Sequence, residues 1–218
     1  MKKLVVLSVS AVLVGFLSLY GREALDLYRL MDFVASSASA KELDGGPWPR
    51  LTDACVTCHG RQGQSQHQQY PSLAGQPAPY LASQLKRFAS GERASPNMAP
   101  LAMTLSEADI QSLSEYFAKH AATANQAFKP DPALQAKGER LVASGGCAAC
   151  HGPGLMGHDQ FPRLAGQGHD YLLTQLNDFA QGRRKDPMGA MTAIASTLSP
   201  EDREALSHYL AALAPVAK

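Results

Sequence analysis

Two copies of one short motif organise this sequence: CVTCHG at residues 55–60 and CAACHG at residues 147–152. All 4 cysteines of the chain stand in these two motifs. A disulfide framework does not require a histidine directly after each pair of cysteines. The motif therefore points to chemistry in which two thiols and an imidazole act together.

The C-x-x-C-H pattern is typical of covalent c-type haem attachment. With two residues between them at the start of a helical turn, both thiols can reach the vinyl groups on one haem edge. The adjacent histidine then reaches the iron. We expect His59 and His151 to be proximal iron ligands, and we expect thioether bonds from Cys55, Cys58, Cys147 and Cys150.

Zinc binding and dithiol redox chemistry are the alternatives for these pairs. Two C-x-x-C pairs can in principle share one zinc ion, but a zinc site does not require histidine after both second cysteines. A thioredoxin-like dithiol would belong to a βαβ pattern, which the sequence lacks. Two attached haems therefore explain the residues best.

The likeness between the two halves extends well beyond the cysteines. The pattern P-x-L-A-G-Q of residues 71–76 recurs at 162–167, and Y-L-x-x-Q-L-x-x-F of residues 80–88 recurs at 171–179. The Leu and Phe positions in the second pattern are spaced i, i+4, i+7, which indicates one buried face of a helix. No alternating run is long enough for a strand. We therefore predict an all-α chain with two tandem domains.

The end of each copy carries a helix-start signal. Ser106 and Ser199 each precede an Asp by three residues, close to the capping-box pattern, and Pro200 suits the first helical position. We expect the last helix of each domain to begin at these serines.

The ligand on the far side of each iron decides between a carrier and a catalyst. A thioether sulfur there favours reduced iron and closes the site to dioxygen or peroxide. Met98 and Met191 are the candidates, because each stands seven residues before the Leu-Ser that opens the last helix. Met103 and Met188 are near enough to be rivals.

Several other repeated residues suit the surroundings of a haem. Pro71 and Pro162 lie after the attachment motifs, where a prolyl carbonyl can accept from the ligand histidine and fix its tautomer. Three further pairs are candidates for haem-edge or propionate contacts, or for ordinary packing: Tyr80 and Tyr171, Gln84 and Gln175, Arg93 and Arg184.

The N-terminus carries an export signal or a membrane anchor. Lys2 and Lys3 precede an uncharged, mostly apolar run from Leu4 to Tyr20, at the short end of what spans a bilayer. No small-x-small cleavage site adjoins Tyr20, so we favour an uncleaved transmembrane anchor over a removed signal peptide. The lysines place the N-terminus in the cytoplasm and everything after Arg22 on the opposite side of the membrane. An exported protein that becomes soluble after signal cleavage is the alternative.

These features divide the chain into five segments. We expect an anchor or signal helix at 1–40, a linker at 41–50, a first domain at 51–122, a second linker at 123–137 and a second domain at 138–218.

The formal charge of +1 and the 18% of charged residues give no basic face for nucleic acid, so we exclude that partner.

With these residues assembled, the chain resembles the cytochrome c4 family of dihaem cytochromes from about Pro47 to the C-terminus. The resemblance implies two pseudo-two-fold related cytochrome c domains with His/Met irons and two covalent haem c groups. It also implies periplasmic electron transfer from a quinol-oxidising complex, a quinol:cytochrome c oxidoreductase, to a terminal oxidase. A long N-terminal segment is the departure from the family pattern.

Three functions stay open at this point. The first is a membrane-tethered respiratory electron carrier without enzyme activity of its own. The second is the cytochrome subunit of a dehydrogenase acting on sulfide, an alcohol or an aldehyde. The third is a dihaem peroxidase, against which the two equivalent methionines argue because a peroxidase needs one open iron.

Overall fold

The computed structural model describes residue 16 and residues 20–36 and 50–216, which fall into two compact units, Met1–Arg50 and Leu51–Lys218. In the first unit, residues 20–36 are helical and carry exposed apolar side chains such as Leu27 and Met31. No helix among the described residues is both long and apolar enough to cross a membrane. Most of the predicted Leu4–Tyr20 anchor lies outside those residues.

The first half of the second unit contains four α-helices. They are α2 (Asp53–His59), α3 (Ala78–Ala89), α4 (Met98–Ala102) and α5 (Glu107–Lys119), and a 3-10 turn η1 (Arg61–Gly63) follows α2. Helix α3 packs against α4 and α5. The predicted capping box is confirmed at the start of α5. The Ser106 hydroxyl accepts from the backbone N–H of Asp109, and the Asp109 carboxylate accepts from the backbone N–H of Ser106.

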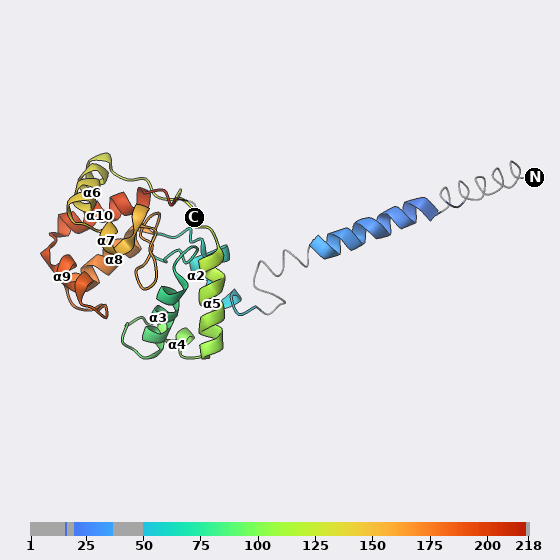
Figure 1. Cartoon of the computed structure of the whole chain (residues 1–218), viewed down its shortest axis with the longest axis horizontal. Coiled ribbons are helices and arrows are strands. Elements are labelled where there is room, and N and C mark those ends of the chain that lie inside the picture. Colours follow the sequence, from blue (N-terminus) through green and yellow to red (C-terminus); the bar gives the residue numbers. More distant parts are fainter. Residues whose placement is uncertain (1–15, 17–19, 37–49, 217–218) are drawn as a thin grey trace, which may run out of the picture. The chain divides into compact units, whose positions relative to one another are not determined.

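The second half repeats this plan with one more helix in the described residues. It contains α6 (Pro132–Ser144), α7 (Ala148–His151), η2 (Pro153–Leu155), α8 (His169–Ala180), α9 (Ala190–Thr197) and α10 (Pro200–Ala212). Helix α10 packs against α6 and α8, and its capping box at Ser199 is confirmed. Figure 1 shows α3, α4 and α5 gathered on one side and α6, α8, α9 and α10 on the other.

Helix α6 begins inside the segment that we expected to be a linker, 123–137. The carboxylate of Asp131 accepts from the backbone N–H groups of Ala133 and Leu134, and Pro132 occupies the first helical position. These are strong helix-start signals. The helical part of the second half therefore starts at Pro132 rather than at residue 138.

Each half has its own apolar core. Leu81, Leu113, Tyr116 and Phe117 form the first cluster, with Cys55 packed against it. Leu155, Leu172, Leu210 and Ala211 form the second, with Cys147 packed against it. Strand pairing in the described part of the chain is limited to one bridge between His158 and Phe161, in agreement with the all-α prediction.

Polar side chains join the two halves. Gln68 of the first half accepts from the backbone N–H of His169 through its side chain, at 3.0 Å, and from that of Tyr171 through its carbonyl, at 2.9 Å. The first turn of α8 thus finds acceptors for its unpaired N–H groups in the other domain. The carbonyl of Gln68 also approaches Gly168 so closely that an added Cβ would lie 2.4 Å from it.

Candidate functional site

Both attachment motifs lie on short helices beside the apolar cores. Helix α2 carries Cys55, Cys58 and His59, and Cys147 is the residue that caps α7, which ends at His151. Because each motif covers about one helical turn, its two thiols and its imidazole project from the same short segment. No disulfide joins any of the four cysteines, so all four are available for thioether bonds.

The two histidines are buried and held in the same way. Nδ1 of His59 lies 2.8 Å from the carbonyl oxygen of Pro71, and Nδ1 of His151 lies 2.8 Å from that of Pro162. A carbonyl can only accept, so Nδ1 carries the proton and Nε2 keeps its lone pair for a metal. Burial lowers the pKa of both rings, which favours the neutral form that binds iron. The predicted prolyl acceptors are confirmed.

Glycine after each histidine turns the chain sharply. Gly60 has φ 74° and ψ 168°, and Gly152 has φ 74° and ψ 174°, a region that is essentially restricted to glycine. At Gly60 a Cβ would also lie 2.0 Å from the carbonyl oxygen of Gln64. The turn sends the chain from the histidine toward the loop that supplies its prolyl acceptor.

The predicted methionines stand at the starts of α4 and α9. The backbone N–H of Met98 donates to Ser95 Oγ at 3.2 Å, and that of Met191 donates to Asp186 Oδ1 at 3.1 Å. Both side chains are half-buried, whereas the rivals Met103 and Met188 are each 69% exposed. The two pairs therefore differ in burial.

Comparison with known proteins decides the family. A model of the cytochrome c family matches residues 50–121 and 135–214. The cytochrome c4 of Thiocapsa roseopersicina is 38% identical over 175 residues, which cover 75% of this chain and 89% of the relative. The chain belongs to the cytochrome c4 family.

Other relatives support the same assignment. The crystal structure of reduced recombinant cytochrome c4 from Pseudomonas stutzeri matches this cytochrome with a TM-score of 0.68 at 34% identity, covering 74% of this chain and 94% of that chain. A thiosulfate dehydrogenase electron acceptor of Thiomonas intermedia (strain K12) is 37% identical over 174 residues, 75% of this chain and 80% of the relative. The chain is thus a dihaem electron-transfer protein with two covalently attached haem c groups.

A cluster of repeated polar residues at the domain boundary suits the haem propionates. Arg93 donates to Tyr171 at 3.0 Å and to Gln175 at 2.9 Å, and Arg184 donates in return to Tyr80 at 3.1 Å and to Gln84 at 3.2 Å.

No carboxylate among the described residues pairs with either guanidinium of this cluster. Burial would raise the pKa of the Tyr171 phenol, but the two arginines lower it to about 8. Two enclosed cations without an anion are costly. The acidic groups of two bound haems would supply the missing charge.

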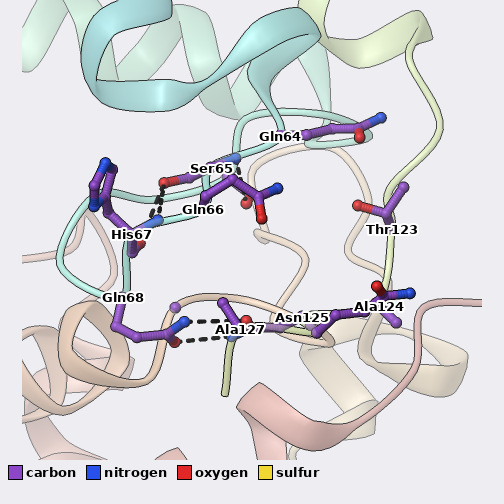
Figure 2. Close-up of a pocket in the computed structure, with 13 residues that line it drawn as sticks. Gln64, Ser65, Gln66, His67, Gln68, Thr123, Ala124, Asn125 and Ala127 are labelled. Carbon is purple, nitrogen blue, oxygen red and sulfur yellow. Dashed lines mark hydrogen bonds between the residues drawn. The ribbon is translucent and has the colours of Figure 1, made fainter.

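The cavity in Figure 2 is separate from the attachment motifs. It measures about 220 Å³ and lies between residues 64–68, residues 123–127 and the glycines at 166 and 168. Gln68 and Asn125 exchange two side-chain hydrogen bonds across it, at 3.1 and 2.9 Å. Its lining is polar and contains none of the predicted haem ligands. We assign it to the packing of the linker against both domains.

A histidine and glutamate cluster on α8 and α10 resembles a metal site. Nε2 of His169 and Nε2 of His208 lie 3.3 and 3.4 Å from the same oxygen of Glu204. However, Nδ1 of His208 accepts from the backbone N–H of Asp131 at 3.0 Å, so the proton of the neutral ring lies on Nε2. That nitrogen, 3.4 Å from Glu204 Oε1, therefore carries the proton and offers no lone pair to a metal. The cluster instead holds the start of α6 against α10.

Sequence analysis missed three buried interdomain residues: Gln76, Arg163 and Gln167. They are only 4%, 1% and 2% exposed. The repeat did contain a signal, because both glutamines close a P-x-L-A-G-Q pattern. One sequence, however, does not reveal that each glutamine contacts the opposite copy.

Proposed function

We propose that this cytochrome carries electrons, one at each of two closed haem sites, in a bacterial respiratory chain. Cys55 and Cys58 would attach the first haem and Cys147 and Cys150 the second. His59 with Met98, and His151 with Met191, would bind the two irons. The observation that carries the proposal is the duplication of a buried histidine whose Nδ1 is held by a prolyl carbonyl.

The surrounding residues have defined tasks in this proposal. When bound, each haem stores one electron as its iron alternates between the ferric and ferrous states. Pro71 and Pro162 keep the histidine tautomers fixed, so that neither ring must reorient between states. The side chains of Ser95 and Asp186, which accept from the backbone N–H groups of Met98 and Met191, would hold the two methionines in place. A site closed on both sides changes little in geometry with oxidation state, which suits rapid electron transfer rather than substrate turnover.

The respiratory route proposed for the electrons runs from a quinol-oxidising complex to a terminal oxidase. Stopped-flow mixing with a bacterial quinol:cytochrome c oxidoreductase and quinol should reduce both haems, and a terminal oxidase should reoxidise them. Failure of both reactions with a fully low-spin protein would contradict this route without affecting the two-haem assignment.

A dehydrogenase is the second candidate donor. Relatives named as thiosulfate dehydrogenase electron acceptors support it, since one is 37% identical over 75% of this chain. The discriminating experiment mixes the oxidised cytochrome with a thiosulfate dehydrogenase and thiosulfate, in parallel with the quinol-oxidising complex. Faster reduction by the dehydrogenase, together with its copurification from native membranes, would establish the subunit role.

The N-terminal segment is proposed to export the chain and then to remain as an anchor on the periplasmic side. Lys2, Lys3 and the uncharged run that follows them support this. The intact mass of the natively expressed protein should include residue 1 onward, and the protein should stay in the membrane pellet after an alkaline wash. A shortened, soluble periplasmic form would show that the segment is a cleaved signal peptide.

A further inference from the structure

One peptide unit links the second proximal histidine to the first domain. The carbonyl of Pro162 accepts from Nδ1 of His151 at 2.8 Å. The N–H of the same peptide unit, which belongs to Arg163, donates to Oε1 of Gln76 at 2.9 Å. A hydrogen-bonded chain thus runs from the imidazole through one peptide group into the other domain.

The reverse connection has the same form. The carbonyl of Pro71 accepts from Nδ1 of His59 at 2.8 Å, and the N–H of Ser72 in that peptide unit donates to Oε1 of Gln167 at 2.6 Å. Gln167 is a residue of the second domain. Each domain therefore provides the glutamine that contacts the proximal loop of the other.

The orientation of both side-chain amides is fixed by their second contacts. Nε2 of Gln76 donates to the carbonyl of Arg163 at 2.9 Å, and Nε2 of Gln167 donates to the carbonyl of Ser72 at 3.0 Å. Turning either amide over would place a donor against an N–H and an oxygen against a carbonyl. With 4% and 2% exposure, the two side chains also leave no room for water to replace them.

We propose that Gln76 tunes the reduction potential of the haem held by the second domain, and that Gln167 tunes that of the haem in the first. An acceptor on a peptide N–H polarises the group, so that its carbonyl becomes a stronger acceptor. A stronger bond from Nδ1 gives the ligand histidine more anionic character, which favours ferric iron. Each glutamine is a positioning residue that lowers the opposite potential. The inference rests on the proposed ligands His59 and His151.

The test is a crossed pair of substitutions in the full-length holoprotein. Gln76→Leu should raise the potential of the second-domain haem and leave that of the first-domain haem unchanged. Gln167→Leu should do the opposite. Spectroelectrochemical titration measures both potentials, and NMR of the haem methyl groups assigns each to its domain. Where the leucine variant does not fold, Gln76→Met or Gln167→Met keeps the side-chain length and removes the amide.

A matched control separates this effect from loosening of the interface. Nε2 of Gln160 donates across the same boundary to the carbonyl of Pro79 at 3.3 Å, and it contacts neither proximal peptide. Gln160→Leu should leave both potentials unchanged. The proton on Nδ1 of the opposite ligand histidine should shift upfield in the Gln76 and Gln167 variants alone, as its hydrogen bond weakens.

Equal shifts of both reduction potentials in every interface variant would overturn the proposal. A potential shift confined to the haem of the substituted domain would also overturn it, and so would unchanged potentials. The potentials and NMR shifts are measured without a partner protein, so the result stays valid if the proposed respiratory route is wrong. An error in the ligand assignment would appear in the NMR spectrum of the wild-type protein, where the ring protons of His59 or His151 would lack the shifts of an iron-bound imidazole.

Discussion

Gly60 shows how one residue shapes the surroundings of the proximal histidine. Its backbone occupies a region restricted to glycine, and any side chain there would meet the Gln64 carbonyl at 2.0 Å. Gly152 has nearly the same backbone angles, but its Cβ would meet only a His158 ring atom, at 3.4 Å. The two glycines thus have the same backbone strain, but only at Gly60 would a side chain also clash with a neighbouring carbonyl.

Gly60→Ala should therefore destabilise the protein more than Gly152→Ala. Backbone strain accounts for about 1–3 kcal/mol in both variants, and the clash adds about 1–3 kcal/mol at Gly60 alone. Guanidinium unfolding of the holoproteins measures both free energies of unfolding. Equal losses in the two variants would show that the Gln64 carbonyl imposes no additional constraint.

The methionine ligands can be tested at the same scale. Met98→Ala and Met191→Ala should each remove half of the methionine-to-iron charge-transfer absorption of the oxidised protein and lower the potential of one haem. Met103→Ala and Met188→Ala, at exposed positions, should leave both signals intact. Persistence of the full absorption in either of the first two variants would refute that ligand.

At the scale of elements, α6 and α10 of the second domain cross at close range. A Cβ on Gly138 would lie 2.1 Å from the carbonyl oxygen of Ala205 and 2.6 Å from Cβ of Tyr209. Because Gly138 has no side chain, the backbones of α6 and α10 can approach each other at this position.

Gly138→Ala should destabilise the second domain despite the better helix propensity of alanine. The propensity gain is about 1 kcal/mol, and overpacking of about 1–3 kcal/mol opposes it, because the contact is with backbone that must move. Glu139→Ala, at the exposed neighbouring position of the same helix, should change stability by less than about 0.5 kcal/mol. Thermal unfolding followed by circular dichroism measures both, and a more stable Gly138→Ala protein would contradict the close crossing.

Local sequence patterns predicted the helices better than they predicted the contacts between the two domains. The apolar spacing of α3 and α8 and the capping boxes of α5 and α10 were visible because they depend on neighbouring residues. The first turns of α6 fall inside the segment expected to be a linker, 123–137, where the Asp-Pro pair at 131–132 was not recognised as a helix start. The prolyl acceptors followed from the repeat. The crossed contacts of Gln76 and Gln167 did not, because pairing between the two copies depends on how the domains dock.

At the scale of the whole molecule, Arg163 holds the two domains together. Its guanidinium donates to the carbonyls of Ala74, at 3.0 Å, and Ser72, at 3.3 Å, both in the other domain, and to Ala165 in its own. Burial lowers its pKa to about 10, so the group stays charged at neutral pH. The position equivalent to Arg163 in the first copy is Ser72, so this contact has no pseudo-symmetric partner.

Arg163→Ala should uncouple the domains. Loss of hydrogen bonds from a charged donor to buried carbonyls costs about 1.5–3 kcal/mol each before relaxation. We expect a single calorimetric unfolding transition in the wild type to split into two. Arg183→Ala, which removes an exposed arginine that pairs with Asp178 within one domain, should leave the transition single. A single transition in Arg163→Ala as well would show that other contacts dominate the interface.

The most direct test of the two-haem carrier is a redox titration of the full-length protein with its haem content determined by intact mass. The account predicts two covalently bound haems per chain and two reversible one-electron steps, with low-spin spectra in both oxidation states. One haem per chain, or a high-spin ferric component that binds peroxide, would contradict it.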